Sequence, residues 1–375
     1  MTTRSPLLAD VPPHRLLSLD VFRGGIMVLL AGEAANVYGS LGDAVAGHPV
    51  LEAIVTQFHH HPWNGLRFWD LIQPFFMFIV GVAMAYSVRK RRERGESWSG
   101  TLRHIVIRCA LLLLFGVMLH CGYAGHLVWE LWNVLSQLSV TILVAYLLFN
   151  LPWRTQLIVS LALIGLTEVL YRTFPLEGFN EPFVQGKSFG AYMDMVLMGK
   201  INGGGWVAIN ALPTSAHTIW GVIAGKWLQE ERAPGDKIRW LAIWGIIGLA
   251  IGYGLDGAGV TPIIKRICTS SFVIVSGGWC LLALAATYAL VDVKGYRRFA
   301  PFFVVVGANS IFIYLFFETV GHQWFNGFVG IFTLGIAGWL HLPETAGAVV
   351  TAFTVLALEW GLCYLLYRRR WFFKI

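Results

Sequence analysis

Long apolar stretches separated by clusters of charged residues constrain this chain more than any other feature of its sequence. About ten such stretches occur, over residues 18–38, 70–88, 104–123, 128–149, 155–173, 206–227, 239–255, 271–291, 301–320 and 347–367. An α-helix needs roughly 20 mostly apolar residues to cross a hydrocarbon core about 30 Å thick. The pattern therefore predicts an all-α polytopic membrane protein with about ten transmembrane helices.

A further apolar stretch, 325–342, is interrupted by four glycines and is either an eleventh span or a segment at the membrane interface. Lys and Arg collect in short cytoplasmic loops of membrane proteins. With ten spans, the basic residues fall on one side, mainly in 89–94, 226–239, 294–298 and 368–374. An eleventh span would move the basic C-terminus to the opposite side, so we favour the interfacial interpretation, with both termini in the cytoplasm.

The composition agrees with a membrane location. Of 375 residues, 56% are hydrophobic and only 13% are charged, whereas soluble domains carry about 25% charged residues. This excludes an ordinary soluble enzyme, a disordered chain and a nucleic-acid-binding domain, and it makes the net charge of +7 a signal of orientation. We expect a single transmembrane domain over 1–375, embedded in the lipid bilayer. Residues 174–204 are expected to form an extracytoplasmic loop that either caps a site or is simply solvated.

Ionisable residues inside the first apolar stretch are costly and therefore candidates for function. Asp20 and Arg23 are three residues apart and share one helix face, where they could also form a purely structural pair. Glu33 lies thirteen residues beyond Asp20, or roughly 20 Å further along a helix. Glu33 is therefore expected near the external end of the first span.

Three consecutive histidines, His59 to His61, precede the second span, which begins near Asp70. Imidazole titrates near neutrality, so a histidine here is a candidate general base for acyl transfer. Glu33 or Asp70 would orient that imidazole. The alternatives are a polar interface cluster or a metal site for the histidines, and a favourable helix N-terminus for Asp70. No Cys, Asp or Glu follows at ligand spacing, so no metal site is predicted.

Other polar and small residues in the spans favour helix packing. Asn133, Ser136 and Ser215 are expected to join helices by hydrogen bonds, and the small-xxx-small spacing of Gly221 and Gly225 is typical of close helix contact.

Ordered sequence blocks along the whole chain resemble one known family. The blocks SLDVFRG (18–24) and HHHPWNGLRFWDLIQPFFMFIVG (59–81) are followed by AYMDMVLMG (191–199), TPIIKRICTSSF (261–272) and VDVKGYRRFAPFFVVVGANSIFIY (291–314). Together they resemble the catalytic domain of heparan-α-glucosaminide N-acetyltransferase and its bacterial relatives, which are transmembrane acyltransferases. The resemblance implies transfer of an acetyl group from cytoplasmic acetyl-CoA to a sugar amine across the membrane. The family's essential histidine, three residues before the tryptophan of the W-N-G block, corresponds to His60.

We combine the residues and the resemblance into one mechanistic hypothesis. His60 acts as base or acyl carrier, with Glu33 and Asp70 as further catalytic candidates. The acceptor-binding candidates are Trp63, Asn64, Asp194 and Lys265. Of these, Asn64 or Lys265 could also bind the carbonyl oxygen as charge develops on it. The candidates for acetyl-CoA binding are Arg23, Arg89, Arg298, Asn309 and Ser310.

A secondary transporter or permease for a small polar or sugar-like solute is the alternative, because spans with buried polar groups suit it equally. Carriers commonly contain two related halves, but the blocks of the first two stretches have no counterpart in 206–291. We therefore favour an enzyme of the bacterial inner membrane that modifies an envelope glycan or an imported amino sugar. The resemblance is compatible with a homodimer.

Overall fold

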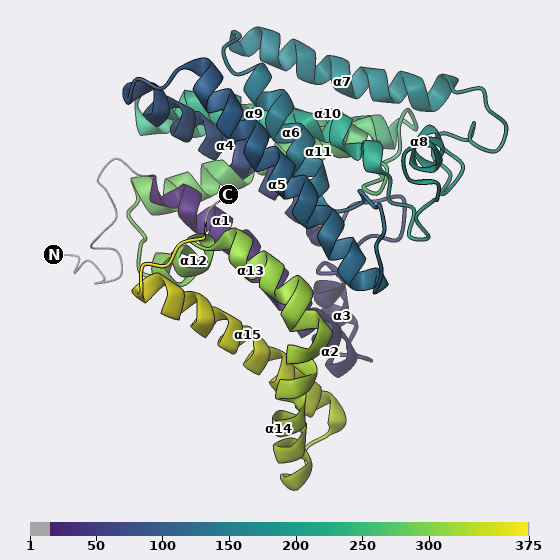
Figure 1. The fold of residues 1–375 in the computed structure, drawn as a ribbon, viewed down its shortest axis with the longest axis vertical. Helices are drawn as coiled ribbons and strands as arrows, with labels where there is room; N and C mark the ends of the chain where they lie inside the picture. Colours follow the sequence, from purple (N-terminus) through teal and green to yellow (C-terminus); the bar gives the residue numbers. More distant parts are fainter. Residues whose placement is uncertain (1–15, 374) are drawn as a thin grey trace. The chain divides into compact units, whose positions relative to one another are not determined.

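The computed structural model describes residues 16–373 and 375, which form helices joined by turns and loops (Figure 1). Within this part of the chain, the only β-type pairing outside helices is a single antiparallel bridge between Asn64 and Ile264. The chain divides into two compact units. Unit 1 comprises the described residues of Met1–His60, Arg67–Trp69 and Thr287–Ile375, and unit 2 comprises His61–Leu66 and Asp70–Ala286.

Unit 2 contains most of the long helices. In chain order they are α4 (Ile72–Glu93), α5 (Trp98–Ala124), α6 (Val134–Leu147), α7 (Trp153–Thr173), α8 (Phe189–Met198), α9 (Ala211–Gln229), α10 (Pro234–Gly257) and α11 (Ser270–Tyr288), whose last residues pass into unit 1. Short 3₁₀ turns, Phe68–Leu71 and Ala208–Asn210, lead into α4 and α9.

Glycines allow α4 and α9 to pack backbone against backbone. A Cβ on Gly81 would lie 2.1 Å from the carbonyl oxygen of Thr218, and a Cβ on Gly221 would lie 2.1 Å from the carbonyl oxygen of Phe78. Gly225 likewise faces Ala85. The helices run side by side and α9 is buried along most of its length. The small-xxx-small spacing of Gly221 and Gly225 therefore serves helix packing, as predicted.

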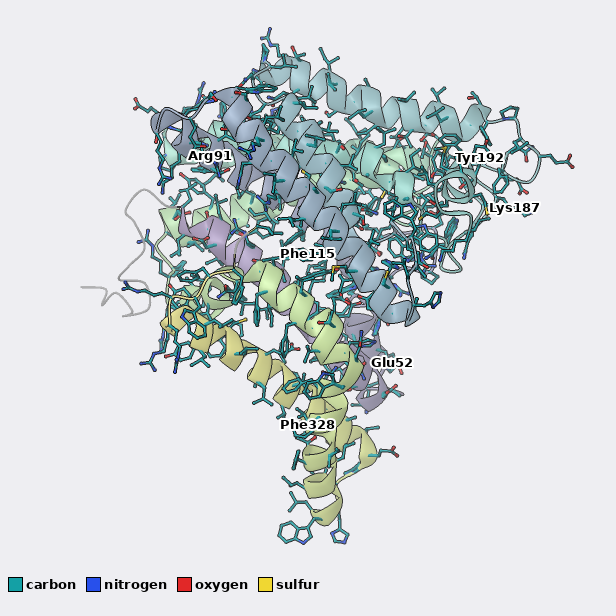
Figure 2. The ribbon with its side chains drawn as sticks, viewed as in Figure 1. Glu52, Arg91, Phe115, Lys187, Tyr192 and Phe328 are labelled. Carbon is teal, nitrogen blue, oxygen red and sulfur yellow. The ribbon has the colours of Figure 1, made fainter. Side chains whose placement is uncertain are left out.

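The loops predicted to be cytoplasmic meet at one end of unit 2. Arg89, near the C-terminus of α4, lies 3.4 Å from the amide oxygen of Gln229 at the C-terminus of α9. Arg92 donates to Asn150 in the loop between α6 and α7, and Lys226 donates to the carbonyl of Phe149. Figure 2 labels Arg91 in the same basic turn of α4. Within unit 2, the basic residues that follow separate predicted spans thus gather together.

Unit 1 combines the N-terminal helices with about the last quarter of the chain. Its helices are α1 (Leu17–Ala34), α2 (Val37–Ala44), α3 (Pro49–Thr56), α12 (Ala300–Gly307), α13 (Ser310–Phe316), α14 (Asn326–Trp339) and α15 (Glu344–Arg368). A π-helical turn, Ala289–Val293, precedes α12, and a second, Phe317–Phe325, joins α13 to α14. We call Phe317–Phe325 the π segment.

Backbone contacts and a remote cap hold α1 in unit 1. A Cβ on Gly24 would lie 1.9 Å from the carbonyl oxygen of Phe303, so α1 and α12 touch through their main chains. The carboxylate of Asp292 accepts hydrogen bonds from the N–H groups of Leu17 and Ser18, both at 3.1 Å. These N–H groups have no partner within their own helix, so Asp292 supplies the cap.

The predicted helix 301–320 is interrupted in the structure. Asn309, with φ −122° and ψ 39°, separates α12 from α13, and the two helical parts meet at a bend of 74°. Helix then continues from Ser310 to Trp339. The glycines of 325–342 therefore do not separate this stretch from the preceding helix, and the expected boundary near residue 320 is wrong. Phe328 on α14, labelled in Figure 2, is half exposed at 50%.

Over the described residues, six helices are long and apolar enough to cross a membrane, or seven if the bent pair is one span. The all-α membrane class is confirmed, whereas the prediction of ten spans exceeds this number. Three predicted spans explain most of the difference. The helix α1 carries three charged residues, α6 is only 14 residues long, and α9 carries buried hydroxyl and imidazole groups. The predicted cytoplasmic N-terminus lies largely outside the described residues.

Candidate functional site

The segment that contains the histidines forms a closed loop between α3 and α4. The backbone N–H of Trp69 donates to the carbonyl oxygen of Gln57 at 2.9 Å, and the N–H of Phe68 donates to the Gln57 side chain at 3.3 Å. Arg67 donates to the carbonyl oxygen of His60 at 2.9 Å. These bonds fix the backbone of His60 within unit 1. His60 is half-buried, whereas His59 is exposed.

Glu33 is held beside this loop by a buried tryptophan. The indole N–H of Trp69 donates to Glu33 Oε1 at 3.0 Å, and Trp69 is only 1% exposed. The ring of Tyr38 packs edge-on against Trp69, with centroids 5.1 Å apart. Unit 1 thus places an exposed carboxylate and the loop of His60 against one tryptophan. The sequence predicted Glu33 as a catalytic candidate but did not predict Trp69 as its partner.

Asp70 forms a buried ion pair in unit 2. Its Oδ1 lies 3.8 Å from Lys265 Nζ, and both side chains are buried, with exposed fractions of 1% and 7%. Its Oδ2 accepts from the backbone N–H of His61 at 3.2 Å. The ammonium of Lys265 also lies over the ring of Trp206, 5.3 Å from its centroid. The structure therefore joins a predicted catalytic residue to a predicted acceptor-binding residue, a pairing that the sequence did not reveal.

The W-N-G block is fastened to two distant segments of unit 2. The indole N–H of Trp63 donates to the carbonyl oxygen of Phe183, at 2.8 Å, in the predicted external loop. Asn64 pairs with Ile264, and its side chain is exposed. Gly65 has φ +143°, a conformation that favours glycine, and a Cβ there would lie 2.5 Å from the His61 imidazole. Of these residues, Asn64 keeps a side chain open to a ligand.

Asp194 is fully buried inside the predicted external loop. One oxygen accepts from the indole N–H of Trp132 at 2.8 Å and the other from the N–H of Ala208 at 2.9 Å. Burial raises the pKa of Asp194 to about 6, although both hydrogen bonds act in the opposite direction. Asp194 therefore fastens α8 to the segments before α6 and α9.

The donor-binding candidates lie in both units. In unit 1, Asn309 is completely buried; its amide donates to the carbonyl oxygen of Trp371 at 3.1 Å, and its Oδ1 accepts from the N–H of Phe373 at 3.0 Å. Ser310 donates to the carbonyl oxygen of Gly307 at 2.8 Å. Arg23 is half-buried in α1 and Arg298 is exposed. Asn309 thus holds the C-terminal tail at the break between α12 and α13.

The remaining donor-binding candidate, Arg89, belongs to unit 2. Its guanidinium forms an ion pair with Glu93, at 2.9 Å, one turn further along α4. Both side chains are largely exposed. Arg89 therefore lies at the basic end of unit 2 described above, whereas the other donor-binding candidates lie in unit 1.

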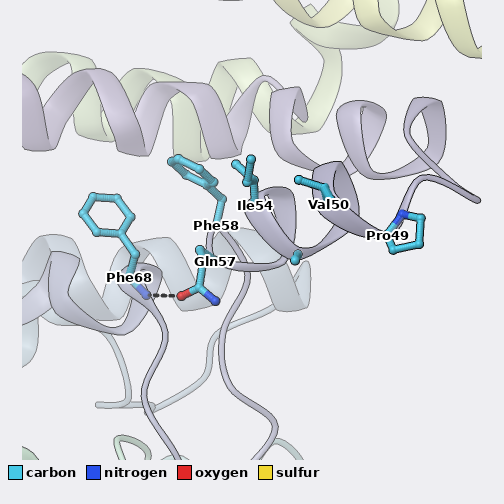
Figure 3. A pocket seen from close by; sticks show the side chains of 7 residues that line it. Pro49, Val50, Ile54, Gln57, Phe58 and Phe68 are labelled. Atoms are coloured by element: carbon cyan, nitrogen blue, oxygen red, sulfur yellow. Dashed lines mark hydrogen bonds between the residues drawn. The ribbon is translucent and has the colours of Figure 1, made fainter.

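A groove of about 660 Å³ adjoins the loop of His60 in unit 1 (Figure 3). Its lining residues are Pro49, Val50, Ala53, Ile54, Gln57, Phe58 and Phe68. Gln57 is the only one with a polar side chain, and Figure 3 shows its bond to the N–H of Phe68. The groove therefore offers hydrocarbon contacts rather than hydrogen bonds. Across residues 16–373 and 375, no group of three His, Cys, Asp or Glu residues could hold a metal ion.

Sequence reasoning overlooked one buried carboxylic acid. Glu359 lies in α15 and is 1% exposed. The signal was available, because a carboxylate within the apolar stretch 347–367 is as unusual as Glu33 within the first stretch.

The sequence is similar to a known protein family and to two named proteins. Residues 15–198 match a family described as a domain of unknown function (DUF5009). Over alignments 440 positions long, the chain is 27% identical to human heparan-alpha-glucosaminide N-acetyltransferase and 26% identical to the mouse protein. The alignments cover 98% and 99% of this chain but only 61% and 63% of the relatives. The chain thus spans less than two thirds of the length of these relatives.

Proposed function

Because the chain belongs to the heparan-α-glucosaminide N-acetyltransferase-like family of membrane proteins, we propose that it is a transmembrane N-acetyltransferase. The observation that carries this proposal is similarity along nearly the whole chain to two relatives that bear this name. The similarity includes the segment with Glu33, His60 and Asp70 rather than a single isolated motif.

The proposed reaction takes an acetyl group from cytoplasmic acetyl-CoA and delivers it to an amino sugar or glycan on the extracytoplasmic side. Acetyl-CoA and a free amine yield the acetamide and CoA, so one amine proton must be removed. The gathering of Arg89, Arg92 and Lys226 at one end of unit 2 supports a common cytoplasmic face for these loops. We propose ten spans in a bacterial inner membrane, with both termini in the cytoplasm.

His60 is the proposed base or acyl carrier. As a base, its imidazole would take the amine proton during attack on the thioester carbonyl; as a carrier, it would accept the acetyl group from CoA and pass it to the amine. Its fixed backbone supports either role, since a reacting group must be held in position. Glu33, held by Trp69 in the same unit, is the carboxylate proposed to orient the His60 imidazole.

The other candidates receive narrower roles. Asn64, with its exposed amide, is the proposed contact to the acceptor or to the carbonyl oxygen. The buried pair of Asp70 and Lys265 is proposed to support the W-N-G block, because Asp70 also binds the N–H of His61. Arg23 and Arg298 remain proposed contacts to the phosphates of acetyl-CoA.

The experiment is transfer of labelled acetyl from acetyl-CoA to glucosamine and a panel of amino sugars by the purified protein. His60→Ala should abolish the product, and His59→Ala, at an exposed neighbouring position, should retain it. Incubation without an acceptor distinguishes the two roles, because only an acyl carrier leaves label on the protein. A folded wild-type protein that neither binds acetyl-CoA nor transfers acetyl to any of these sugars would refute the proposal and favour a transporter.

A further inference from the structure

The carboxyl group of Glu359 is buried without a hydrogen-bond partner in the described part of the chain. Glu359 lies on α15, one of the helices that are long and apolar enough to cross a membrane, and its side chain is 1% exposed. Neither Oε1 nor Oε2 has a hydrogen-bond partner among the described residues. A charged carboxylate in such a position is strongly disfavoured unless a proton or a cation neutralises it. The neutral acid is therefore the favoured form.

The surroundings of Glu359 bring its carboxyl group against a helix backbone. Its Oε1 lies 3.0 Å from the position that a Cβ on Gly321 would occupy. Gly321 is in the π segment, Phe317–Phe325, which replaces regular α-helix between α13 and α14. The π-helix is rare in proteins, and where it does occur it is frequently part of a functional site. A glycine here leaves room for the carboxyl group, and any larger residue would press on it.

No counter-ion reaches Glu359 within residues 16–373 and 375. Cys363 lies one turn further along α15 and is itself buried. The titratable or charged groups on the elements of unit 1 packed against α15, namely α1, α2, α12, α14 and the adjoining π segment, are Asp20, Arg23, Glu33, Tyr38, Asp43, Glu318 and His322. In the described part of the chain, none of them forms an ion pair or hydrogen bond with Glu359.

From this geometry we infer that Glu359 and the π segment form an intramembrane proton-binding site, in which the carboxyl group is protonated at neutral pH. The ligand is a proton, taken up by the carboxylate and held where burial excludes competing cations. The inference is independent of acetyl transfer, because it rests on a helix and a carboxyl group that the proposed reaction does not use.

Dicyclohexylcarbodiimide tests the protonated carboxyl group directly, since this apolar reagent reacts with carboxylic acids inside membranes. The acid proton moves to a nitrogen of the carbodiimide, the carboxyl oxygen bonds to its central carbon, and the adduct rearranges to a stable N-acylurea. The full-length protein in membranes should be labelled at Glu359 near neutral pH, and labelling should fall at least severalfold at high pH. The exposed Glu344 of the same helix serves as an internal control and should remain unlabelled.

Infrared spectroscopy supplies a second readout that does not depend on reagent access. The difference spectrum of wild type minus Glu359→Gln, at neutral pH, should contain the carbonyl stretch of a protonated carboxyl group. A carboxylate band in its place, or protection of Glu359 from the reagent by sodium or potassium, would overturn the inference. Persistence of the label in Glu359→Gln would also overturn it, because the reacting group would then lie elsewhere.

Discussion

The contact between α4 and α9 predicts a strong effect for a very small substitution. In Gly221→Ala, the new methyl group would lie 2.1 Å from the carbonyl oxygen of Phe78, whereas ordinary contact begins at about 3.4 Å. The helices would therefore have to separate by more than 1 Å. Overpacking of this kind lowers the free energy of unfolding by about 1–3 kcal/mol. The higher helix propensity of alanine raises it by about 0.5–1 kcal/mol. We expect a net loss of about 1–2 kcal/mol.

Thermal unfolding of the purified protein in detergent measures this loss. At about 2–4 °C per kcal/mol, the apparent Tm should fall by about 2–8 °C. Gly165→Ala in α7 is the matched control, because no atom lies within 4 Å of its new Cβ, and its Tm should stay the same or rise. Gly81→Ala faces the same interface, so the double variant with Gly221→Ala should lose less than the sum of the two losses. Strict additivity, or equal Tm values for Gly221→Ala and Gly165→Ala, would refute the packing argument.

Three further predictions concern the candidate site. Lys265→Met should destabilise the protein by about 3–5 kcal/mol, because it leaves Asp70 buried without its ion pair. Adding Asp70→Asn should restore part of the lost Tm. An unchanged Tm in Lys265→Met alone would contradict this prediction. Burial raises the pKa of Asp194 from 3.8 to about 6, so its neutral form is favoured in the folded state and stability should rise, by about 3 kcal/mol or less, as pH falls from 7 to 4. Tm measured against pH should show this rise in wild type and a flatter profile in Asp194→Asn. Trp69→Phe removes the hydrogen-bond donor to Glu33. Because hydrogen bonds to charged groups contribute about 1.5–3 kcal/mol, the rate of acetyl transfer should fall about tenfold or more. The control Trp324→Phe, at a position 57% exposed, should leave the rate unchanged.

The sequence predicts the helical membrane class because that class depends on stretch length and apolar content, which are local properties. The spacing of Gly221 and Gly225 also predicts that their helix packs closely against another helix, since small residues four positions apart lie on one helix face. It does not predict that the partner is α4. Nor does the sequence predict the helix break at Asn309. That residue lies inside an apolar run, and its amide is satisfied by the backbone of Trp371 and Phe373, far along the chain.

The candidate site was only partly predictable for the same reason. The histidines and Asp70 stand close together in the sequence, so their proximity follows from chain connectivity. The pairing of Asp70 with Lys265, and of Glu33 with Trp69, depends on tertiary packing between segments that are distant in sequence. A single sequence contains no local signal for such pairs. Their roles in acetyl transfer stay predictions until the variants are assayed.

The cap on α1 has a consequence for how the chain is made. The two backbone N–H groups at the start of α1 bond to Asp292, whose position is 275 residues beyond Leu17. At synthesis rates of about 5–20 residues per second, the ribosome adds Asp292 on the order of 15–55 s after Leu17. During that interval, the first N–H groups of α1 must bond to other acceptors, such as water. The cap on the first helix therefore forms late in translation, when about the last quarter of the chain is made.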